Sequence, residues 1–334
     1  MLFPIPYSLY LYNCREPREG ILRKILAGIT IGLMACSACL GHAKEPCATA
    51  GTNNAFLGIQ TIKLWPGDAP QAKGNACEDT PTLTLFSPHW GDGNGSAVLI
   101  FPGGGYAGLA GVHEGREFAD WFTERGFHAF ILSYRLSSNG YLLPVPLIDA
   151  RRAIQTVRAR AADYHIDPHH IVIIGFSAGG HLAALAATDP VPGDPNADDP
   201  IERVSSRPDL AVLAYPWIGA LTTDTTHISY CKQFNVMDRC EELRKAYSPD
   251  LLVSKDTPPV FIFHTYTDQT VPVEQSLKFF DALVKAGDQS EMHIFANGHH
   301  GVGLGGVDPA LEQWPNLLDA WLRAHGLLGS AGSP

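Results

Sequence analysis

The chain has 334 residues, of which 45% are hydrophobic and 17% are charged. A chain of this length can bury a large core, and about 250–300 of its residues fit one α/β domain. The formal net charge is −10. Because nucleic acids and anionic membrane surfaces attract basic proteins, this acidic balance argues against both as partners.

The first 43 residues have the features of a signal peptide. Arg23 and Lys24 precede an apolar run at residues 25–35, which is short for a membrane span but suits the central region of a signal peptide. Gly41-His42-Ala43 offers small residues for cleavage before Lys44. We therefore expect export to the periplasm or secretion, with residues 44–330 forming a single domain.

Lipidation is the main alternative for this leader. Residues 33–36 match a bacterial lipobox, in which Cys36 would become the lipidated first residue. The protein would then be a lipoprotein anchored at Cys36, and a membrane would be a partner only in that case. An uncleaved membrane anchor is the third alternative, and no obligatory protein partner is expected.

The number of cysteines agrees with export. Three of the seven fall in the leader, and the other four are Cys47, Cys77, Cys231 and Cys240. An even number in an exported chain predicts disulfides, here two, and the close spacing of Cys231 and Cys240 predicts that they close one loop. Free buried thiols are the alternative. A zinc site is disfavoured because no C-x-x-C pair occurs in the mature region.

From about residue 55 onward, strand-like apolar runs alternate with helical patterns. The runs predict strands at residues 58–64, 82–86, 97–101, 128–134, 171–175, 210–215, 260–265 and 291–295. The helical patterns fall at residues 114–125, 147–164, 178–188, 273–286 and 309–325. This alternation predicts an α/β fold, with a mostly parallel sheet of about eight strands and helices on both faces. Ligands of such folds bind beyond the carboxyl ends of the strands.

Two segments fall outside this alternation. Residues 189–199 form a Pro-rich acidic stretch, which lacks the spacing of a calcium-binding loop and is expected to lie on the surface. Residues 222–242 show no clear periodicity and carry the close cysteine pair. We expect residues 218–256, which include this pair, to be an insertion on the substrate side.

The most informative motif is Gly175-Phe176-Ser177-Ala178-Gly179, which lies between a predicted strand and a predicted helix. A serine on a tight strand-to-helix turn is pushed out above the sheet, and the flanking glycines give the strained turn room. A serine hydroxyl is a poor nucleophile by itself. Ser177 would therefore need a base, an orienting acid and an oxyanion site.

The oxyanion site is expected after the central strand at residues 97–101. Pro102-Gly103-Gly104-Gly105-Tyr106 follows this strand, and three glycines allow backbone N–H groups to face a substrate carbonyl. The N–H of Gly104 or Gly105, together with that of Ala178, would form an oxyanion hole. A flexible turn is the alternative. A phosphate-binding loop is disfavoured because neither G-K-[ST] nor G-x-G-x-x-G follows.

The acid and the base are expected after the last two predicted strands. Asp268 follows the seventh strand, where its carboxylate could accept a hydrogen bond from an imidazole or only cap the next helix. His299 and His300 follow the eighth strand, and His300 is the preferred base. The chain order Ser177, Asp268, His300 is that of α/β-hydrolases and differs from the chymotrypsin and subtilisin orders.

Two other polar residues are expected to have structural roles. His181 lies on the helix that follows the serine and is expected to pack beneath the site. Asp149 opens a helix rich in arginine, where we expect it to accept structural hydrogen bonds rather than to serve as a second catalytic acid.

Further runs complete a recognisable pattern. They are His113-Glu114-Gly115, Ser133-Tyr134-Arg135-Leu136, Ile166-Asp167-Pro168 and Gly298 before His300-Gly301. With the serine turn and the glycine loop, these runs resemble the α/β-hydrolase esterase/lipase family, specifically its acetyl-xylan-esterase-like group (xylanase-like, bifunctional feruloyl-acetyl esterase-like). The resemblance extends from about Lys63 to Leu327 and implies an α/β-hydrolase fold with no large lid.

The resemblance implies a serine esterase that removes acetyl, and sometimes feruloyl, groups from plant cell-wall carbohydrate. Its substrate would be an acetylated oligo- or polysaccharide, and it would use no metal and no organic cofactor. A general short-chain or aryl carboxylesterase would share the same catalytic residues. A serine peptidase of this fold usually carries a large extra domain, and a non-catalytic sugar-binding relative would be expected to lack a catalytic residue. Both are disfavoured.

Tyr106, Glu114 and Trp217 are the candidate substrate contacts.

Two positions depart from the family pattern. Pro102 replaces the His of the wider H-G-G-G motif, which concerns the support of the glycine loop rather than its N–H groups. Val302 replaces the Phe that usually follows His-Gly, and we expect it to alter the acyl pocket.

Overall fold

The computed structural model describes residues 59–88, 91–221, 229–306 and 308–328. The predicted leader, its cleavage site, Cys36 and Cys47 lie outside the described residues. Within the described ranges, no helix is both long and apolar enough to cross a membrane.

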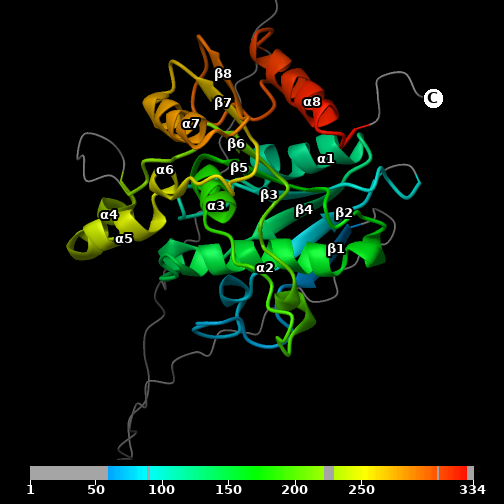
Figure 1. The fold of residues 1–334 in the computed structure, drawn as a ribbon. Helices are drawn as coiled ribbons and strands as arrows, with labels where there is room; N and C mark the ends of the chain where they lie inside the picture. The colour runs from blue at the N-terminus through cyan, green and yellow to red at the C-terminus, as the bar shows by residue number, and fades with distance from the viewer. Residues whose placement is uncertain (1–58, 89–90, 222–228, 307, 329–334) are drawn as a thin grey trace, which may run out of the picture. The chain divides into compact units, whose positions relative to one another are not determined.

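Eight strands form one sheet in the order β1-β2-β4-β3-β5-β6-β7-β8 (Figure 1). The strands are β1 (Ile59–Lys63), β2 (Thr82–Phe86), β3 (Ala97–Phe101), β4 (His128–Ser133), β5 (Ile171–Phe176), β6 (Leu210–Ala214), β7 (Val260–Thr265) and β8 (Glu291–Phe295). β2 pairs antiparallel with β1 and β4, and every other pairing is parallel. The predicted α/β fold with its mostly parallel sheet is confirmed, and each strand ends within one residue of its predicted position.

The helices form a layer on each face of the sheet. α1 (Glu117–Thr123) and α8 (Trp314–Ala324) share one hydrophobic cluster with every second strand residue. α2 (Val145–Ala159), α3 (Ser177–Thr188) and α7 (Glu274–Ala286) share the other. Figure 1 shows α1 and α2 on opposite sides of the sheet. Because all five residues of β3 are buried between these layers, that strand is hydrophobic throughout.

Three predicted helices have different ends in the structure. The first begins with a π-helical turn, η3 (Val112–Arg116), before α1. The second is divided, because α2 ends at Ala159 and a 3-10 turn, η5 (Ala161–Tyr164), follows. A 3-10 turn, η8 (Leu311–Gln313), also precedes α8. Each difference is a change of helix type at a helix end, which side-chain periodicity does not resolve.

The connection from β6 to β7, residues 215–259, contains four short helical elements in its described residues (215–221 and 229–259), which the sequence did not predict. They are α4 (Tyr230–Gln233), η7 (Met237–Arg239), α5 (Cys240–Tyr247) and α6 (Pro249–Leu252). Helical elements of three to eight residues are too short to be stable or periodic by themselves, so they depend on tertiary contacts. We call this connection the β6–β7 segment.

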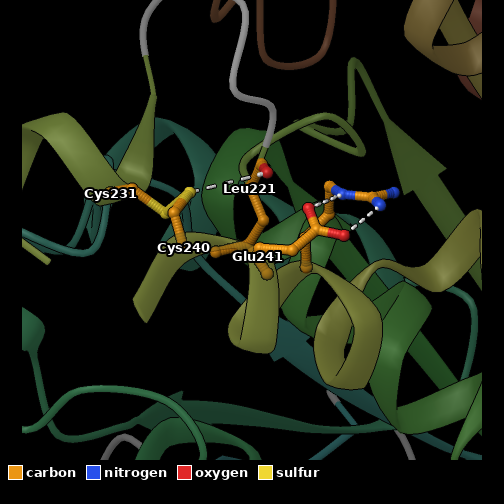
Figure 2. The surroundings of a disulfide bond; sticks show 5 residues. Leu221, Cys231, Cys240 and Glu241 are labelled. Atoms are coloured by element: carbon orange, nitrogen blue, oxygen red, sulfur yellow. Dashed lines mark hydrogen bonds and ion pairs between the residues drawn. A yellow bond between two sulfur atoms is a disulfide. The ribbon is translucent and has the colours of Figure 1, made fainter. Parts of the chain in front are cut away.

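A disulfide between Cys231 and Cys240 closes part of this segment (Figure 2). The two Cα atoms are 5.6 Å apart, and the cysteines are nine positions apart in the sequence. A closed loop of this size stabilises a fold by roughly 2–3 kcal/mol in the chain-entropy model. The predicted pairing of Cys231 with Cys240 is therefore present, whereas a second disulfide stays a prediction because Cys47 lies outside the described residues.

Candidate active site

Ser177 stands at the sharp turn where β5 passes directly into α3. Its φ of +52° lies in the left-handed region, which is strained for a residue with a side chain. The turn also needs a close approach to β3, because a Cβ on Gly179 would lie 2.0 Å from the carbonyl oxygen of Phe101. These features present the Ser177 hydroxyl at the carboxyl edge of the sheet, at the first residue of a helix.

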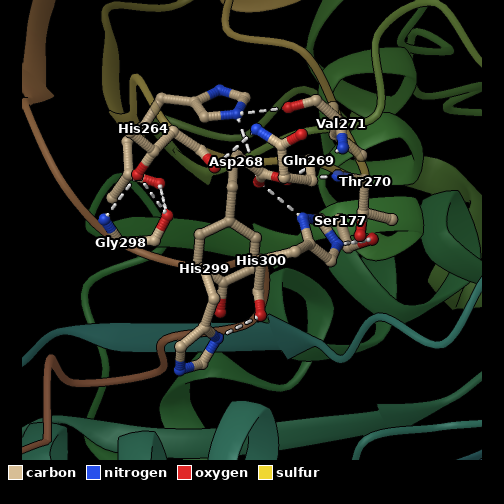
Figure 3. Close-up of polar contacts among 12 residues, drawn as sticks. Ser177, His264, Asp268, Gln269, Thr270, Val271, Gly298, His299 and His300 are labelled. Atoms are coloured by element: carbon tan, nitrogen blue, oxygen red, sulfur yellow. Dashed lines mark hydrogen bonds and ion pairs between the residues drawn. The ribbon is translucent and has the colours of Figure 1, made fainter.

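The structure brings Ser177, His300 and Asp268 together as one hydrogen-bonded triad (Figure 3). His300 Nε2 lies 2.8 Å from Ser177 Oγ, and His300 Nδ1 lies 2.7 Å from Asp268 Oδ2. Since a carboxylate can only accept, Nδ1–H donates to Asp268 and Nε2 is left to accept the proton of the serine hydroxyl. This is the geometry that nucleophilic catalysis by a serine requires.

His299, the other candidate base, is not part of this triad. Its Nδ1 lies 2.7 Å from the carbonyl oxygen of His300, and Figure 3 shows the ring pointing away from Ser177. Of the two adjacent histidines, the structure therefore places only His300 beside the serine.

Asp268 is held as a carboxylate by several donors. The N–H groups of Thr270 and Val271 donate to its Oδ1 at 2.8 and 2.9 Å. Burial alone would raise the pKa of Asp268, but hydrogen bonds from His264 and His300 and from the Val271 N–H outweigh burial and hold its pKa well below the ordinary value. Asp268 is thus ionised throughout the neutral range and able to orient the imidazole.

His264 is a buried neighbour of Asp268 that sequence reasoning missed. It ends the apolar run of β7 and is fully buried. Its Nε2 lies 2.9 Å from the Val271 carbonyl oxygen and 3.5 Å from Asp268 Oδ2 (Figure 3). Its Nδ1 lies 2.7 Å from Ser276 Oγ. The only sequence signal was a polar residue in a buried strand, four positions before Asp268.

The glycine loop after β3 lies on the other side of Ser177. Gly104 has a φ of +126°, and a Cβ there would lie 2.3 Å from the carbonyl oxygen of Gly108, so only glycine fits. Within the described part of the chain, the N–H groups of Gly104 and Gly105 donate to no protein acceptor. Together with Ala178 in the first turn of α3, they are the donors available to a developing oxyanion.

These groups surround a cavity of about 360 Å³. Its walls include Gly104, Gly105, Ser177, Trp217, Val271 and His300. This volume is at the small end of the range for ligand sites, which suits a short acyl group. In the described residues, no group of three or more His, Cys, Asp or Glu side chains is placed to hold a metal ion.

The three candidate substrate contacts have different positions. Tyr106 is fully buried and its hydroxyl lies 2.8 Å from Nδ1 of His181, so its predicted role as a substrate contact was wrong. Glu114 reaches the cavity wall, but its carboxylate accepts hydrogen bonds from the protein. Trp217 lines the cavity while 2% exposed, and among the described residues its indole N–H has no acceptor.

Three further predictions concern residues outside the cavity. Burial lowers the pKa of His181 to about 4, and its Nε2 lies 3.0 Å from the Tyr247 carbonyl oxygen, as a packing residue requires. Asp149 forms a buried ion pair with Arg135, which is a structural role. Val302 packs in the core cluster of α1 and α8 instead of lining the cavity, so the expected effect on an acyl pocket has no basis in the structure.

The eight-stranded sheet, the strand-to-helix serine and the histidine after the last strand define an α/β-hydrolase. The BD-FAE family model matches residues 83–283, which is more than half of the chain. The chain belongs to the BD-FAE family.

Three relatives illustrate this membership. The crystal structure of an acetyl ester-xyloside bifunctional hydrolase from Caldicellulosiruptor lactoaceticus is 36% identical, with a TM-score of 0.70, and the match covers 81% of this chain and 97% of that one. The propionate-bound esterase Est2 from Thermogutta terrifontis is 29% identical, with a TM-score of 0.66, over 82% of this chain and 97% of that one. An acetylxylan esterase from Xylanibacter ruminicola is 30% identical over 69% of this chain, and this chain spans only 46% of that protein's length.

Proposed function

We propose that the protein is a serine esterase that removes acetyl groups from carbohydrate. The observation that carries this proposal is the hydrogen-bonded triad of Ser177, His300 and Asp268. It lies beside a loop in which the N–H groups of Gly104 and Gly105 have no acceptor among the described residues. Similarity to an acetylxylan esterase and to an acetyl ester-xyloside hydrolase supports acetylated xylan or a related polysaccharide as the substrate.

The reaction follows from the positions of these atoms. Ser177 Oγ attacks the ester carbonyl while His300 Nε2 takes the hydroxyl proton, and the N–H groups of Gly104, Gly105 and Ala178 bind the oxygen that becomes negative. His300 then donates the proton to the departing sugar oxygen, which leaves an acetylated Ser177. A water molecule, deprotonated by His300, attacks this ester and releases acetate.

Release of acetate from a natural polymer tests this proposal. Wild-type protein and the Ser177→Ala variant are incubated with acetylated xylan, xyloglucan and pectin, and free acetate is quantified. We expect release by the wild type on at least one polymer and none above background by the variant. Equal release by both proteins would contradict the assignment of Ser177.

A general short-chain carboxylesterase is the second candidate. The apolar side chains of Trp217 and Val271 in the cavity wall would accept a short acyl group on any alcohol, and the solved relative Est2 holds propionate. Comparing kcat/KM for acetate, butyrate and ferulate esters of 4-nitrophenol with acetate release from xylan separates the two. Activity on small esters without activity on any polymer would favour the general esterase; hydrolysis of the ferulate ester would add feruloyl groups to the substrate range.

We further propose that residues 1–43 are a cleaved leader, residues 44–330 form the catalytic domain and residues 218–256 are a substrate-side insertion. The disulfide in the β6–β7 segment supports folding in an oxidising compartment, the periplasm or the exterior. Within the insertion, Gln233 donates a hydrogen bond of 3.0 Å to the Gly105 carbonyl oxygen, beside the cavity. Sequencing the N-terminus of the mature protein tests the leader: a start at Lys44 supports soluble export, and a blocked, lipidated Cys36 supports the lipoprotein.

A further inference from the structure

Glu114 is a buried carboxylate in the middle of the π-helical turn η3, directly before α1. Its side chain is 4% exposed. The nearest basic group is His113, whose Nε2 lies 3.7 Å from Glu114 Oε1 and whose side chain is half exposed. Burying a carboxylate without a close cationic partner is costly, so its hydrogen bonds must compensate. A π-helical turn inside a helical segment is also a frequent feature of functional sites.

The carboxylate connects the two loops on either side of Ser177. Its Oε2 accepts a hydrogen bond of 2.8 Å from the N–H of Gly103, which begins the glycine loop. Its Oε1 accepts one of 3.0 Å from the Tyr215 hydroxyl. That hydroxyl in turn accepts a bond of 3.3 Å from the N–H of Gly303, three residues after His300.

Tyr215 also touches the base itself. Its ring and that of His300 meet edge to face, with centroids 5.2 Å apart. Burial, followed by the charge of Glu114, raises the pKa of the Tyr215 hydroxyl well above its ordinary value, so it remains a donor at every pH of interest. We call the loop after β8 that carries His300 and Gly303 the base loop. A continuous series of hydrogen bonds, through the Glu114 carboxylate and the Tyr215 hydroxyl, therefore joins the glycine loop to the base loop.

We propose that Glu114 is a positioning residue, which fixes the positions of the glycine loop and the base loop relative to each other on the two sides of Ser177. This inference rests on the proposed function and deepens it. Glu114 acts through Gly103 and Tyr215 and does not touch the substrate, which replaces its sequence-based assignment as a substrate contact.

The departure at Pro102 fits this role. The wider H-G-G-G pattern has a histidine there, and proline has no N–H and no polar side chain to support the loop. Here the loop is supported from two other sides, because Glu114 binds the Gly103 N–H and the Tyr134 hydroxyl donates a bond of 2.8 Å to the Pro102 carbonyl oxygen. With the Gly103 N–H occupied, the N–H groups of Gly104 and Gly105 are left for the oxyanion.

Two substitutions of Glu114 separate the hydrogen bonds from the charge. Glu114→Ala removes both bonds. Glu114→Gln keeps an oxygen for the Gly103 N–H and can donate its amide to the Tyr215 hydroxyl, so it preserves the connection while losing the charge. Tyr215→Phe removes only the link to the base loop. Glu117→Ala, an exposed position in the same helical segment, is the matched control.

Hydrolysis of 4-nitrophenyl acetate and inhibition by an aryl trifluoromethyl ketone, which forms an oxyanion on the serine, are measured for each variant. For Glu114→Ala we expect kcat to fall about 10- to 100-fold, since loosening an oxyanion donor costs less than the 10²- to 10³-fold of removing one. KM should change little, and the inhibitor Ki should rise in proportion to the loss of kcat/KM. Glu114→Gln should retain most of the activity, and Tyr215→Phe should lose about 3- to 10-fold in kcat.

Three outcomes would overturn the positioning role. They are a folded Glu114→Ala protein with wild-type kcat, a rise in KM with unchanged kcat, or an equal loss in the Gln and Ala variants. Should Glu114→Ala not fold, Tyr215→Phe and Glu114→Gln carry the test with the same readouts. Failure of the proposed function is distinguishable, because wild-type hydrolysis would then be absent or would survive Ser177→Ala.

Discussion

The two sides of Ser177 are built in different ways. On one side, the proposed base and acid, His300 and Asp268, are side chains, and direct hydrogen bonds join His300 to both Asp268 and Ser177. On the other side, the proposed oxyanion donors are backbone N–H groups of the glycine loop, and Glu114 accepts a hydrogen bond from the Gly103 N–H of that loop. A functional side chain can be recognised in a sequence from its residue type. Functional backbone N–H groups can be recognised only indirectly, from the glycines that carry them and from the residues that hold those glycines in place.

Removing the acid should have the largest effect. In Asp268→Asn the amide can donate to His300 Nδ1, which places the ring proton on Nε2, where it blocks transfer from Ser177. We expect kcat to fall about 10³- to 10⁴-fold while the fold is kept. Steady-state hydrolysis of 4-nitrophenyl acetate measures this, with Asp281→Asn on the exposed face of α7 as the control. A loss below tenfold would mean that Asp268 only caps α7.

Displacing the glycine loop is the corresponding change on the oxyanion side. In Gly104→Ala the Cβ would lie 2.3 Å from the Gly108 carbonyl oxygen at a φ of +126°, so the loop must move. We expect a loss of about 10²- to 10³-fold in kcat, as for removal of an oxyanion donor. Gly108→Ala in the same loop is the control, because no atom lies within 4 Å of a Cβ built there. Equal activities of the two variants would show that the loop does not bind the oxyanion.

His181 is hydrogen-bonded to Tyr106 at the end of the glycine motif, and burial of its imidazole makes the fold sensitive to acid. Its pKa is about 4 in the folded protein, against 6.5 for the free side chain, because burial disfavours the imidazolium. Between these values only the unfolded chain binds the proton, so stability is lost as the pH falls from about 6.5 to about 4. We expect this group to contribute a loss of about 2 kcal/mol between pH 7 and pH 5.

Chemical unfolding at both pH values checks this contribution. The His181→Gln variant cannot bind the proton, so the decrease in its unfolding free energy should be smaller than that of the wild type by this amount. His169→Gln, at an exposed position, should behave like the wild type. An identical pH dependence in all three proteins would refute the assignment.

His264 is the base-side counterpart of Glu114, and its loss should have the smallest effect. Glutamine at this position can still donate toward the Val271 carbonyl oxygen but would not reproduce the contact with Asp268. Because the N–H groups of Thr270 and Val271 still hold the carboxylate, we expect kcat to fall only about tenfold, less than the 10²- to 10⁴-fold that a group which itself transfers the proton contributes. The same assay with His293→Gln on neighbouring β8 provides the control. A loss of kcat as large as that expected for Asp268→Asn would contradict this and would mean that His264 takes a direct part in the reaction.

The same difference between side-chain and backbone groups decides which parts of the fold and the site could be predicted from the sequence. The strands were predictable, since the central ones (β3, β5, β6 and β7) are buried, largely apolar runs. Ser177, Asp268 and His300 were predictable because each follows a predicted strand at the carboxyl edge of the sheet. The roles of Glu114 and His264 were not, since each depends on partners at other places in the chain. Tyr106 was misassigned for the same reason: its position in the glycine loop does not show that its ring turns into the core.

The β6–β7 segment was the least predictable region. Its described helical elements are three to eight residues long, and a disulfide joins α4 to the start of α5, so local periodicity carries little information about it. The sequence indicated only an insertion beside the site. Its contact with the glycine loop, through Gln233 and Gly105, required the structure.

Covalent labelling of Ser177 tests the central claim most directly. The protein is titrated with 4-nitrophenyl diethyl phosphate, and residual esterase activity is compared with the phosphorylated fraction of the peptide that contains Ser177, measured by mass spectrometry. We predict that activity falls in proportion to label on Ser177 and reaches zero at one label per chain, and that Ser177→Ala takes up none. Full activity in a protein whose Ser177 is completely labelled would contradict the account.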